Sequence, residues 1–448
     1  MIRNLIRKIS TNPFWNKLFR NMFSATVGEA GSAVLTVLTT IIMVRVLGDT
    51  QYSTFVLAQA YMNIIDGLIN FQSWAAVIKF GAERIAKDDY DGLHSIIKLG
   101  TIVDLSTAFA GMIIALFIAP QVGHLLGWNE SLIICAAWFS MEIVFHFSGT
   151  SVGVLRLFNR FNLVAVQKIV VASVKCIVSF VFLINKITDL KSFVIVYVVA
   201  DIIGHLLLTA MSVYVIRKEE NLSLSGIAKA PTKKYSKKFW SFAFWSNLAT
   251  SIDIPVKQFD VFIMSVISYE MVAVYKVYKQ IGNILVELSV PISQSIMPQF
   301  SELVAYGKLK ECYSVMEKLH KSILYLMVPC TIIITALSPK LLFVLFGELY
   351  AKYFYILSIF LFVRSYALSY TAVHQLFTSL GLVREDFYIT GTSNIVYVIV
   401  AYFLAKEIGL LGIVLALALQ VMLSINLKKV KIKKMLPSSD HEQTTQLS

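Results

Sequence analysis

The stretch IIMVRVLGDTQYSTFVLAQAYMNII, Ile41 to Ile65, is matched about 220 residues later by FIMSVISYEMVAVYKVYKQIGNIL, Phe262 to Leu285. The two stretches align when one residue is skipped, and Asn63 then falls on Asn283. Further on, FGAERIA, Phe80 to Ala86, matches FSELVA, Phe300 to Ala305, again with one gap. Similarity at a fixed distance predicts that the second half of the chain repeats the first.

The composition is that of a membrane protein. Of 448 residues, 57% are hydrophobic and 15% are charged, and the mean hydropathy is +0.71. Soluble domains carry about 25% charged residues. Because apolar runs long enough to span a bilayer recur throughout, we expect an all-α polytopic membrane protein. The twelve expected spans are roughly 22–45, 51–78, 97–122, 131–155, 162–185, 192–216, 239–264, 271–297, 321–346, 353–380, 386–405 and 408–427.

The connections between these spans are short, and they suggest the domain organisation. The longest, residues 217–238, is polar and basic, and we expect it to be a cytoplasmic linker between an N-lobe, 22–216, and a C-lobe, 239–427. Six spans per lobe is an even number, so the repeat should be parallel, with a site between the halves near the membrane midplane. Residues 1–21 form a basic segment expected to lie on the inner membrane surface. A basic and polar tail, 428–448, should be cytoplasmic.

Lysine and arginine predict the orientation. With a cytoplasmic N-terminus, 28 of the 40 lie in inner segments, six lie in outer loops and six lie within spans. This bias predicts that both termini are cytoplasmic. It also accounts for most of the net charge of +13 without a nucleic-acid partner. The four cysteines, Cys135, Cys176, Cys312 and Cys330, are scattered, which argues against a metal site or a disulfide framework, and we expect no cofactor.

Polar side chains follow one face of the helix expected at 271–297. They fall within an arc of about 100°. If that arc faced lipid, its three charges would cost about 8–10 kcal/mol, so it should line a hydrated cavity. The residues of this face are Lys276, Lys279, Gln280, Asn283 and Glu287.

Two other spans carry polar residues at helical 4-3-4-3 spacing. One stripe is Gln59, Asn63, Asp66, Asn70 and Ser73, and the other is Ser246, Thr250, Asp253, Lys257 and Asp260. Because the repeat equates the second and eighth spans, Gln59, Asn63 and Asp66 should face Asn283 and Lys279 between the halves. We therefore expect Asn70, Gln280, Glu287 and Asp253 to belong to the same polar lining.

Five intramembrane cations are candidate ligands for an anionic cargo, namely Lys279, Lys276, Lys175, Lys257 and Arg364. For each of these cations we also consider a purely structural role. Asp253 and Lys257 are four residues apart and could pair with one another. Arg364 could pair with Glu142, and Lys276 could extend to the membrane interface. His146 and His374 are expected to be buried, hydrogen-bonded side chains.

The segment MVRVLGDTQYSTFVLAQA, Met43 to Ala60, resembles the R-x-L-G-x-x-x-Y-G-x-(Y/F) element of Wzx-type polysaccharide flippases of the MOP superfamily, which also contains the MATE efflux pumps. Arg45, Gly48 and Tyr52 match this element, whereas Ser53 replaces its usual second glycine. The segments LRLFNRFNLVAVQKI, from Leu155, and PISQSIMPQFSEL, from Pro291, also resemble the family.

This resemblance implies two six-helix lobes in a V and alternating access. It implies transport of an undecaprenyl-pyrophosphate-linked oligosaccharide across the bacterial inner membrane for surface polysaccharide biosynthesis. The lysines would then bind the pyrophosphate, because lysine acts as a point-charge ligand of phosphate. The expected partners are this lipid-linked substrate, membrane lipids, and a polysaccharide polymerase and chain-length protein, with the transporter itself a monomer.

Two alternatives remain open from the sequence. A MATE-like efflux pump for small cations would use acids such as Asp66, Asp104, Asp201 or Glu287 to bind protons or sodium. Lysines in the cavity oppose a cationic cargo. An integral-membrane enzyme, such as a polymerase or ligase, should carry a long outer loop with catalytic arginines or histidines. The outer loops here are short and contain no recognisable catalytic motif, so we expect no enzyme activity.

Overall fold

The computed structural model describes residues 13–71 and 73–436, with side chains from Gly28 onward except 287–295, 297 and 298. Residues 1–12 of the predicted surface helix, the side chain of Glu287 and the last twelve residues of the tail lie outside this description. Residues 13–21 are the beginning of the long helix α2 (Pro13–Ile69). Within the described ranges every regular element is helical, as an all-α protein requires. The chain forms two compact units, one of residues 1–254 and 268–280, the other of 255–267 and 281–448.

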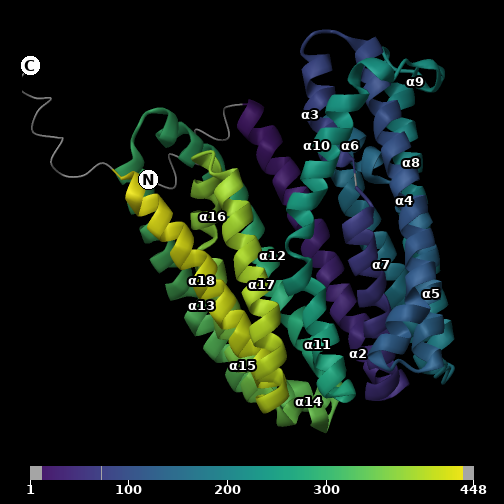
Figure 1. Ribbon diagram of the computed structural model, residues 1–448, viewed down its shortest axis with the longest axis vertical. Helices are drawn as coiled ribbons and strands as arrows, with labels where there is room; N and C mark the ends of the chain where they lie inside the picture. Colours follow the sequence, from purple (N-terminus) through teal and green to yellow (C-terminus); the bar gives the residue numbers. More distant parts are fainter. Residues whose placement is uncertain (1–12, 72, 437–448) are drawn as a thin grey trace, which may run out of the picture. The chain divides into compact units, whose positions relative to one another are not determined.

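Unit 1 is a bundle built around a long bent helix, α2, which packs along α7 and also contacts α4, α5 and α8 (Figure 1). Its elements are α2 (Pro13–Ile69), α3 (Trp74–Ile85), α4 (Tyr90–Leu126), α5 (Glu130–Glu142), η1 (Ile143–Phe145), α6 (Gly149–Leu157), α7 (Phe161–Ile184), α8 (Leu190–Lys218), α9 (Leu224–Lys229), α10 (Lys233–Ser251) and the start of α12 (Tyr269–Ala305).

The corner in α2 is made by Gly48, whose φ is 72° and ψ is 170°. This conformation is almost restricted to glycine, because a side chain would be strained there. The glycine therefore ends the first predicted span and begins the second. In the first arm, Gly28 packs directly on α7, where an added Cβ would lie 2.5 Å from the Cβ of Ala165. Small residues allow such close packing where lipid offers no hydrophobic drive for association.

Unit 2 contains the remaining part of α12 and a second set of packed helices, with α17 and α18 forming a tight pair at Gly409. Its other elements are η2 (Pro255–Phe259), α11 (Asp260–Ile267), α13 (Leu309–Phe346), α14 (Glu348–Lys352), α15 (Phe354–Ser369), α16 (Thr371–Ser379), α17 (Val383–Ile408) and α18 (Leu410–Met435). A buried cluster around Phe300, Met316 and Phe377 joins α12, α13 and α16.

Among the described residues, eight helices are long and apolar enough to cross a membrane, or nine if the bent pair Glu130–Phe145 and Gly149–Leu157 is one span. The longest of these stretches contains the first two predicted spans. The predicted spans at 239–264 and 271–297 are not among the eight. They correspond to α10–α11 and α12, the helices that carry the polar stripes.

One expectation about an individual segment needs correction. The stripe from Ser246 to Asp260 does not continue along one helix, because α10 ends at Ser251 and a π-helical turn occupies Pro255–Phe259 before α11. A π turn adds a residue to the helical repeat, so positions beyond it rotate onto another face. Asp260, the last residue of this stripe, is 1% exposed.

The segment predicted to be a linker contains α9, which packs against α4. Lys98 donates hydrogen bonds to the carbonyls of Ala228 at 2.7 Å and Ala230 at 3.0 Å, and His94 accepts one from the Ser223 amide at 3.2 Å. These contacts attach residues 223–230 to unit 1.

Candidate functional site

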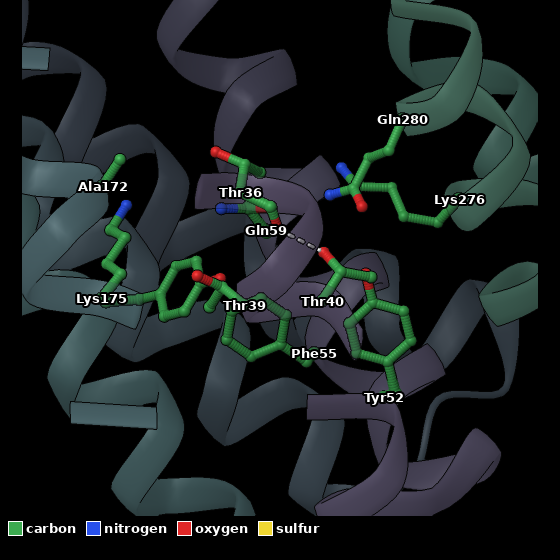
Figure 2. A pocket seen from close by; sticks show the side chains of 11 residues that line it. Thr36, Thr39, Thr40, Tyr52, Phe55, Gln59, Ala172, Lys175, Lys276 and Gln280 are labelled. Carbon is green, nitrogen blue, oxygen red and sulfur yellow. Dashed lines mark hydrogen bonds between the residues drawn. The ribbon is translucent and has the colours of Figure 1, made fainter. Parts of the chain in front are cut away.

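A cavity of about 160 Å³ lies within unit 1, among α2, α7, α8 and α12 (Figure 2). Both arms of α2 contribute to its wall, so the corner at Gly48 brings residues from the first and second predicted spans together. Four of the predicted polar residues line it, namely Gln59, Lys175, Lys276 and Gln280. The remaining lining residues are Thr36, Thr39, Thr40, Tyr52, Phe55, Ala172 and Tyr197.

The lysines come from different helices. In Figure 2, the threonines and Gln59 of α2 lie between Lys175 on one side and Lys276 with Gln280 on the other. Lys175 donates to both carboxylate oxygens of Asp201 at 2.7 Å, and its ammonium lies 4.4 Å from the ring centre of Tyr197. The cavity therefore contains a lysine that is already positioned by an acid and an aromatic ring.

The threonine hydroxyls are oriented by their own helix. Thr36 donates to the carbonyl of Ser32 at 2.8 Å, Thr39 to that of Leu35 at 2.8 Å, and Thr40 to that of Thr36 at 2.9 Å. A hydroxyl has one proton and two lone pairs, so each of these oxygens has lone pairs left for a ligand that donates. This wall can accept hydrogen bonds from hydroxyl groups.

Aromatic side chains close the cavity on the side of α8. Phe55 packs edge-on against Tyr197, with ring centres 4.7 Å apart, and against Phe139 at 5.2 Å. Tyr52 and Phe55 are each 2% exposed. These rings are fixed by packing, so they offer a rigid apolar surface beside the polar wall.

The first turns of α12 are attached to the second arm of α2. The Ala273 amide donates to the Ser53 hydroxyl at 3.1 Å, and the hydroxyls of Thr54 and Tyr269 are 2.8 Å apart. In an α-helix the Ala273 amide also points to the carbonyl of Tyr269, four residues earlier, so Ser53 supplies an additional acceptor from α2. This contact places Lys276 and Gln280 against the cavity.

Several other predicted residues lie away from the cavity lining. Lys279 is 8% exposed, and its ammonium is 5.4 Å from the ring centre of Tyr275. Lys257 is exposed on the π turn, and Arg364 in unit 2 lies over the ring of Phe360 at 5.1 Å. Asn63 is half-buried in unit 1 and Asn283 is exposed in unit 2. Their predicted facing arrangement stays a prediction, as does a lining role for Asp253.

Asp66 and Asn70 belong to a buried polar cluster deeper in unit 1. The carboxylate of Asp66 is 3.1 Å from Nδ1 of His146 and accepts from Asn70 at 3.0 Å. Nε2 of His146 is 3.8 Å from Glu142, the acid that the sequence offered as a partner of Arg364. The ring centres of His146 and His205 are 4.3 Å apart.

Asp104 stabilises the bend between α5 and α6. It accepts hydrogen bonds from the amides of Ser73 at 2.8 Å and Thr150 at 2.5 Å and from both hydroxyls. A buried carboxylate with four donors has its bonding capacity filled. Asp104 therefore has a structural role, because it joins the start of α3 to the start of α6. Lys168 is similarly paired, with Glu29 on α2.

The sequence patterns did not single out four of the residues that shape this site. The threonines at 36, 39 and 40 lie on one helical face of an apolar span, which was the available signal. Asp201 was considered only as a possible proton- or sodium-binding acid of an efflux pump, and not as the partner of Lys175. Its pairing with Lys175 joins α8 to α7 and depends on tertiary packing rather than on spacing.

Comparison with known proteins identifies the family of this chain. The sequence of residues 18–304 matches the family described as "Polysaccharide biosynthesis protein". The chain belongs to this family. It is 24% identical over 147 residues to the inner membrane protein YghQ of Escherichia coli strain K12, a match that covers 32% of this chain and 41% of that relative's length.

Solved structures show the same fold. One is a multidrug-resistance MATE-family transporter of the MOP superfamily in an inward-facing conformation, with a TM-score of 0.75 at 13% identity over 92% of this chain and 96% of that one. Another is a MOP-superfamily transporter from Pyrococcus furiosus, with a TM-score of 0.65 at 12% identity over 94% and 96%. The family match therefore places the chain among polysaccharide biosynthesis proteins, and the solved structures show that its fold is the one seen in MATE-type transporters.

Proposed function

We propose that the protein is a flippase that carries a lipid-linked oligosaccharide, joined to its lipid through pyrophosphate, across the bacterial inner membrane. The observation that carries this proposal is the pair of lysines, Lys175 and Lys276, on a cavity that also presents hydroxyl and amide groups. The family match and the inner-membrane relative support surface polysaccharide biosynthesis as the process.

The chemistry of the cavity fits the two parts of such a head group. A pyrophosphate is anionic, and each hydrogen bond to a charged group contributes about 1.5–3 kcal/mol. Lys276 and Lys175 supply ammonium donors. Sugars donate through hydroxyls, and the threonine oxygens on α2 can accept from them. The rings of Phe55 and Tyr197 can contact the apolar faces of a sugar.

A second candidate is proton- or sodium-coupled efflux of small cations. The MATE-like fold and the buried acids Asp66 and Glu142 favour it. However, these acids face His146 in the interior, whereas the cavity presents ammonium groups. One structural relative, the Pyrococcus furiosus transporter, is described as having a binding pocket of reverse polarity that suggests a different function. In this chain, the ammonium groups of the cavity support an anionic cargo.

Orientation and assembly belong to the same proposal. Both termini and the segment containing α9 would be cytoplasmic, the two six-span lobes would alternate in access, and the working protein would be a monomer. Gln59, Asn63, Gln280 and Asn283 would contact the sugars, while Lys279 and Arg364 would supply further positive charge along the route. A polymerase and a chain-length protein would receive the product.

A charge-balanced double variant tests the cargo site. Lys175→Gln together with Asp201→Asn removes the cavity ammonium without stranding a buried carboxylate. The matched control is Lys168→Gln with Glu29→Gln, the other lysine–acid pair of α7. We expect the first variant to reach normal membrane abundance with at least tenfold less surface polysaccharide. The control should retain both.

Lys276→Gln provides an independent variant on α12. It should reduce export and the binding of purified lipid-linked oligosaccharide in native mass spectrometry, while resistance to cationic dyes stays unchanged. Normal export by both cavity variants at normal abundance would contradict the assignment. A loss of dye efflux with intact polysaccharide export would instead establish the second candidate.

A further inference from the structure

Unit 2 contains a second cavity, of about 360 Å³, where the end of α15 and the short helix α16 meet α18 (Figure 1). We call it the α18 pocket. All of its lining residues belong to unit 2, so it is separate from the cavity of unit 1. Its lining includes Tyr370, His374, Gln375, Gln420, Ser424 and Lys428.

A buried lysine, Lys428, is held at the wall of this pocket. It is 7% exposed, and its Nζ lies 2.5 Å from Oδ1 of Asp386 on α17. The other oxygen of Asp386 lies 3.5 Å from Nδ1 of His374, whose side chain is 56% exposed although the sequence predicted it to be buried. An ammonium group has three protons, so Lys428 can donate to a ligand while it keeps its contact with Asp386.

Neutral polar groups make up the rest of the polar lining. Nε2 of Gln420 donates to Oδ1 of Asn394 at 2.9 Å, which fixes the amide and directs its oxygen away from Asn394. Gln375 and Ser424 add a second amide and a hydroxyl. The ring of Tyr370 is fixed by stacking on His320, with ring centres 3.8 Å apart. The pocket therefore offers both donors and acceptors on a rigid frame.

The end of α18 that adjoins this pocket is rich in lysine. Five of the seven residues 428–434 are lysine. Three of them pair with acids of neighbouring helices, namely Lys428 with Asp386, Lys429 with Glu317 and Lys431 with Glu385. Lysine clusters at the cytoplasmic end of a membrane helix attract anionic lipids. The distribution of lysine and arginine predicts that this end of α18 lies at the inner membrane surface.

We propose that the α18 pocket binds the polyol-phosphate head group of a membrane lipid. Lys428, positioned by Asp386, donates to a phosphate oxygen, because lysine acts as a point-charge ligand of phosphate. The amides of Gln375 and Gln420 and the hydroxyl of Ser424 bind the hydroxyl groups of the polyol, since amides and hydroxyls both donate and accept. A choline head group has no hydroxyls and carries a cation that Lys428 repels, so the pocket discriminates against it.

Two lipids present this chemistry. One is a bilayer phospholipid with a glycerol head group, and the other is the lipid-linked oligosaccharide of the proposed function. The lysine-rich end of α18 favours the bilayer phospholipid, because a lysine cluster at the membrane surface attracts anionic lipids in general. The α18 pocket does not rest on the proposed function, since a bilayer phospholipid is present whatever the protein transports.

The test measures lipid binding to the purified full-length protein by native mass spectrometry. Phosphatidylglycerol, phosphatidylcholine and purified lipid-linked oligosaccharide are titrated separately. Lys428→Gln with Asp386→Asn removes the ammonium without stranding a carboxylate. Lys431→Gln with Glu385→Gln is the matched control, because this pair also joins α17 to α18 but lies outside the pocket lining. The first variant should bind phosphatidylglycerol about tenfold more weakly, the scale of one lost charged hydrogen bond, and the control should bind it normally.

A second pair of variants tests the pocket without changing charge. Ser424→Phe fills it, whereas Met422→Phe places the same side chain on the exposed face of α18, where Met422 is 49% exposed. Phosphatidylglycerol binding should fall in Ser424→Phe and stay normal in Met422→Phe. If the variant at Lys428 and Asp386 fails to fold, this pair decides.

The lipid whose binding falls identifies the source of the head group. A loss for phosphatidylglycerol assigns the bilayer phospholipid, and a loss for the oligosaccharide alone assigns the transported lipid. Lys276→Gln in unit 1 should leave phosphatidylglycerol binding unchanged, so a failure of the unit 1 cavity is distinguished from a failure of the α18 pocket. The proposal is wrong if the pocket variants bind every lipid normally, if the controls lose as much binding, or if the natural protein binds phosphatidylcholine as tightly as phosphatidylglycerol.

Discussion

The hydroxyl oxygen of Ser53 accepts a hydrogen bond from the backbone amide of Ala273 at 3.1 Å. The two residues are 220 positions apart, and both are buried. Ser53 occupies the position at which the family element usually has glycine. Its side chain thus makes a contact with α12 that glycine could not make, and α12 supplies Lys276 and Gln280 to the cavity.

Ser53→Ala should therefore weaken unit 1. Losing one buried hydrogen bond between helices costs about 0.5–1.5 kcal/mol, so we expect a lower unfolding temperature in detergent. Ser32→Ala is the control, because the Ser32 hydroxyl bonds only to the carbonyl of Glu29 within its own helix. Equal effects of the two substitutions would show that the contact with Ala273 contributes nothing.

The packing of α2 on α7 predicts different outcomes for two glycines three residues apart. Gly28→Ala would place its Cβ 2.5 Å from the Cβ of Ala165 and 2.8 Å from its Cα, so the helices must separate. Overpacking of this kind costs about 1–3 kcal/mol. Gly31→Ala meets nothing closer than 3.8 Å and should be neutral or slightly stabilising, because alanine favours the helix.

Thermal unfolding of the two purified variants measures the difference. Ala165→Gly should restore part of the stability lost in Gly28→Ala. If Gly28→Ala is as stable as Gly31→Ala, the close approach of α2 and α7 is wrong.

The connection between α3 and α4 predicts a dependence on pH. The hydrogen bond from the Gly92 amide, followed by that from Arg84, lowers the pKa of Asp89 below its ordinary value of 3.8. A carboxyl whose pKa is lower in the folded state stabilises the protein above its unfolded pKa, and this contribution disappears as the pH falls through the folded pKa.

Asp89→Asn keeps an oxygen for the helix cap but loses the ion pair with Arg84. The variant should be less stable than the natural protein at pH 7, and the gap should narrow at about pH 3, below the ordinary Asp pKa of about 3.9. Asp91→Asn changes a fully exposed carboxylate in the next turn and serves as the control. A gap that stays constant with pH would contradict the role of the Asp89 charge.

The orientation makes a prediction at two exposed serines. In a cysteine-free background, Ser225→Cys on α9 should resist an impermeant thiol reagent added to intact cells, whereas Ser131→Cys at the start of α5 should react. The reason is the 28-to-6 distribution of lysine and arginine between inner and outer segments. The reverse labelling pattern would overturn the orientation, and disruption of the cells should make both cysteines reactive.

The fold class could be predicted from the sequence, because hydropathy determines which segments can cross a bilayer. The family could also be predicted, because Arg45, Gly48 and Tyr52 have the spacing of the family's sequence element. It also placed Gln59, Lys276 and Gln280 on a polar face that the cavity contains. It did not reveal that Asp66 and Asn70 turn toward His146. Spacing gives the face of one helix, whereas the partner of that face depends on how neighbouring helices pack.

Breaks within helices were also difficult to predict from the sequence. The bend after Phe145 is marked in the sequence only by the small and polar residues 148–153, and the π turn by Pro255. Each break changes which side chains share a face. The spacing of the residues from Ser246 to Asp260 therefore fits one face of a continuous helix. In the structure the π turn divides these residues between two helices.

Gly48 carries a consequence for reading other sequences. Its backbone angles require glycine, and a Cβ built there would touch nothing within 4 Å, so the constraint is the turn of the main chain and not a ligand. A chain with another residue at this position would have to turn its main chain differently between these two helices. The glycine therefore constrains the path of the backbone, whereas the chemistry of the cavity is set by the side chains on either side of the corner.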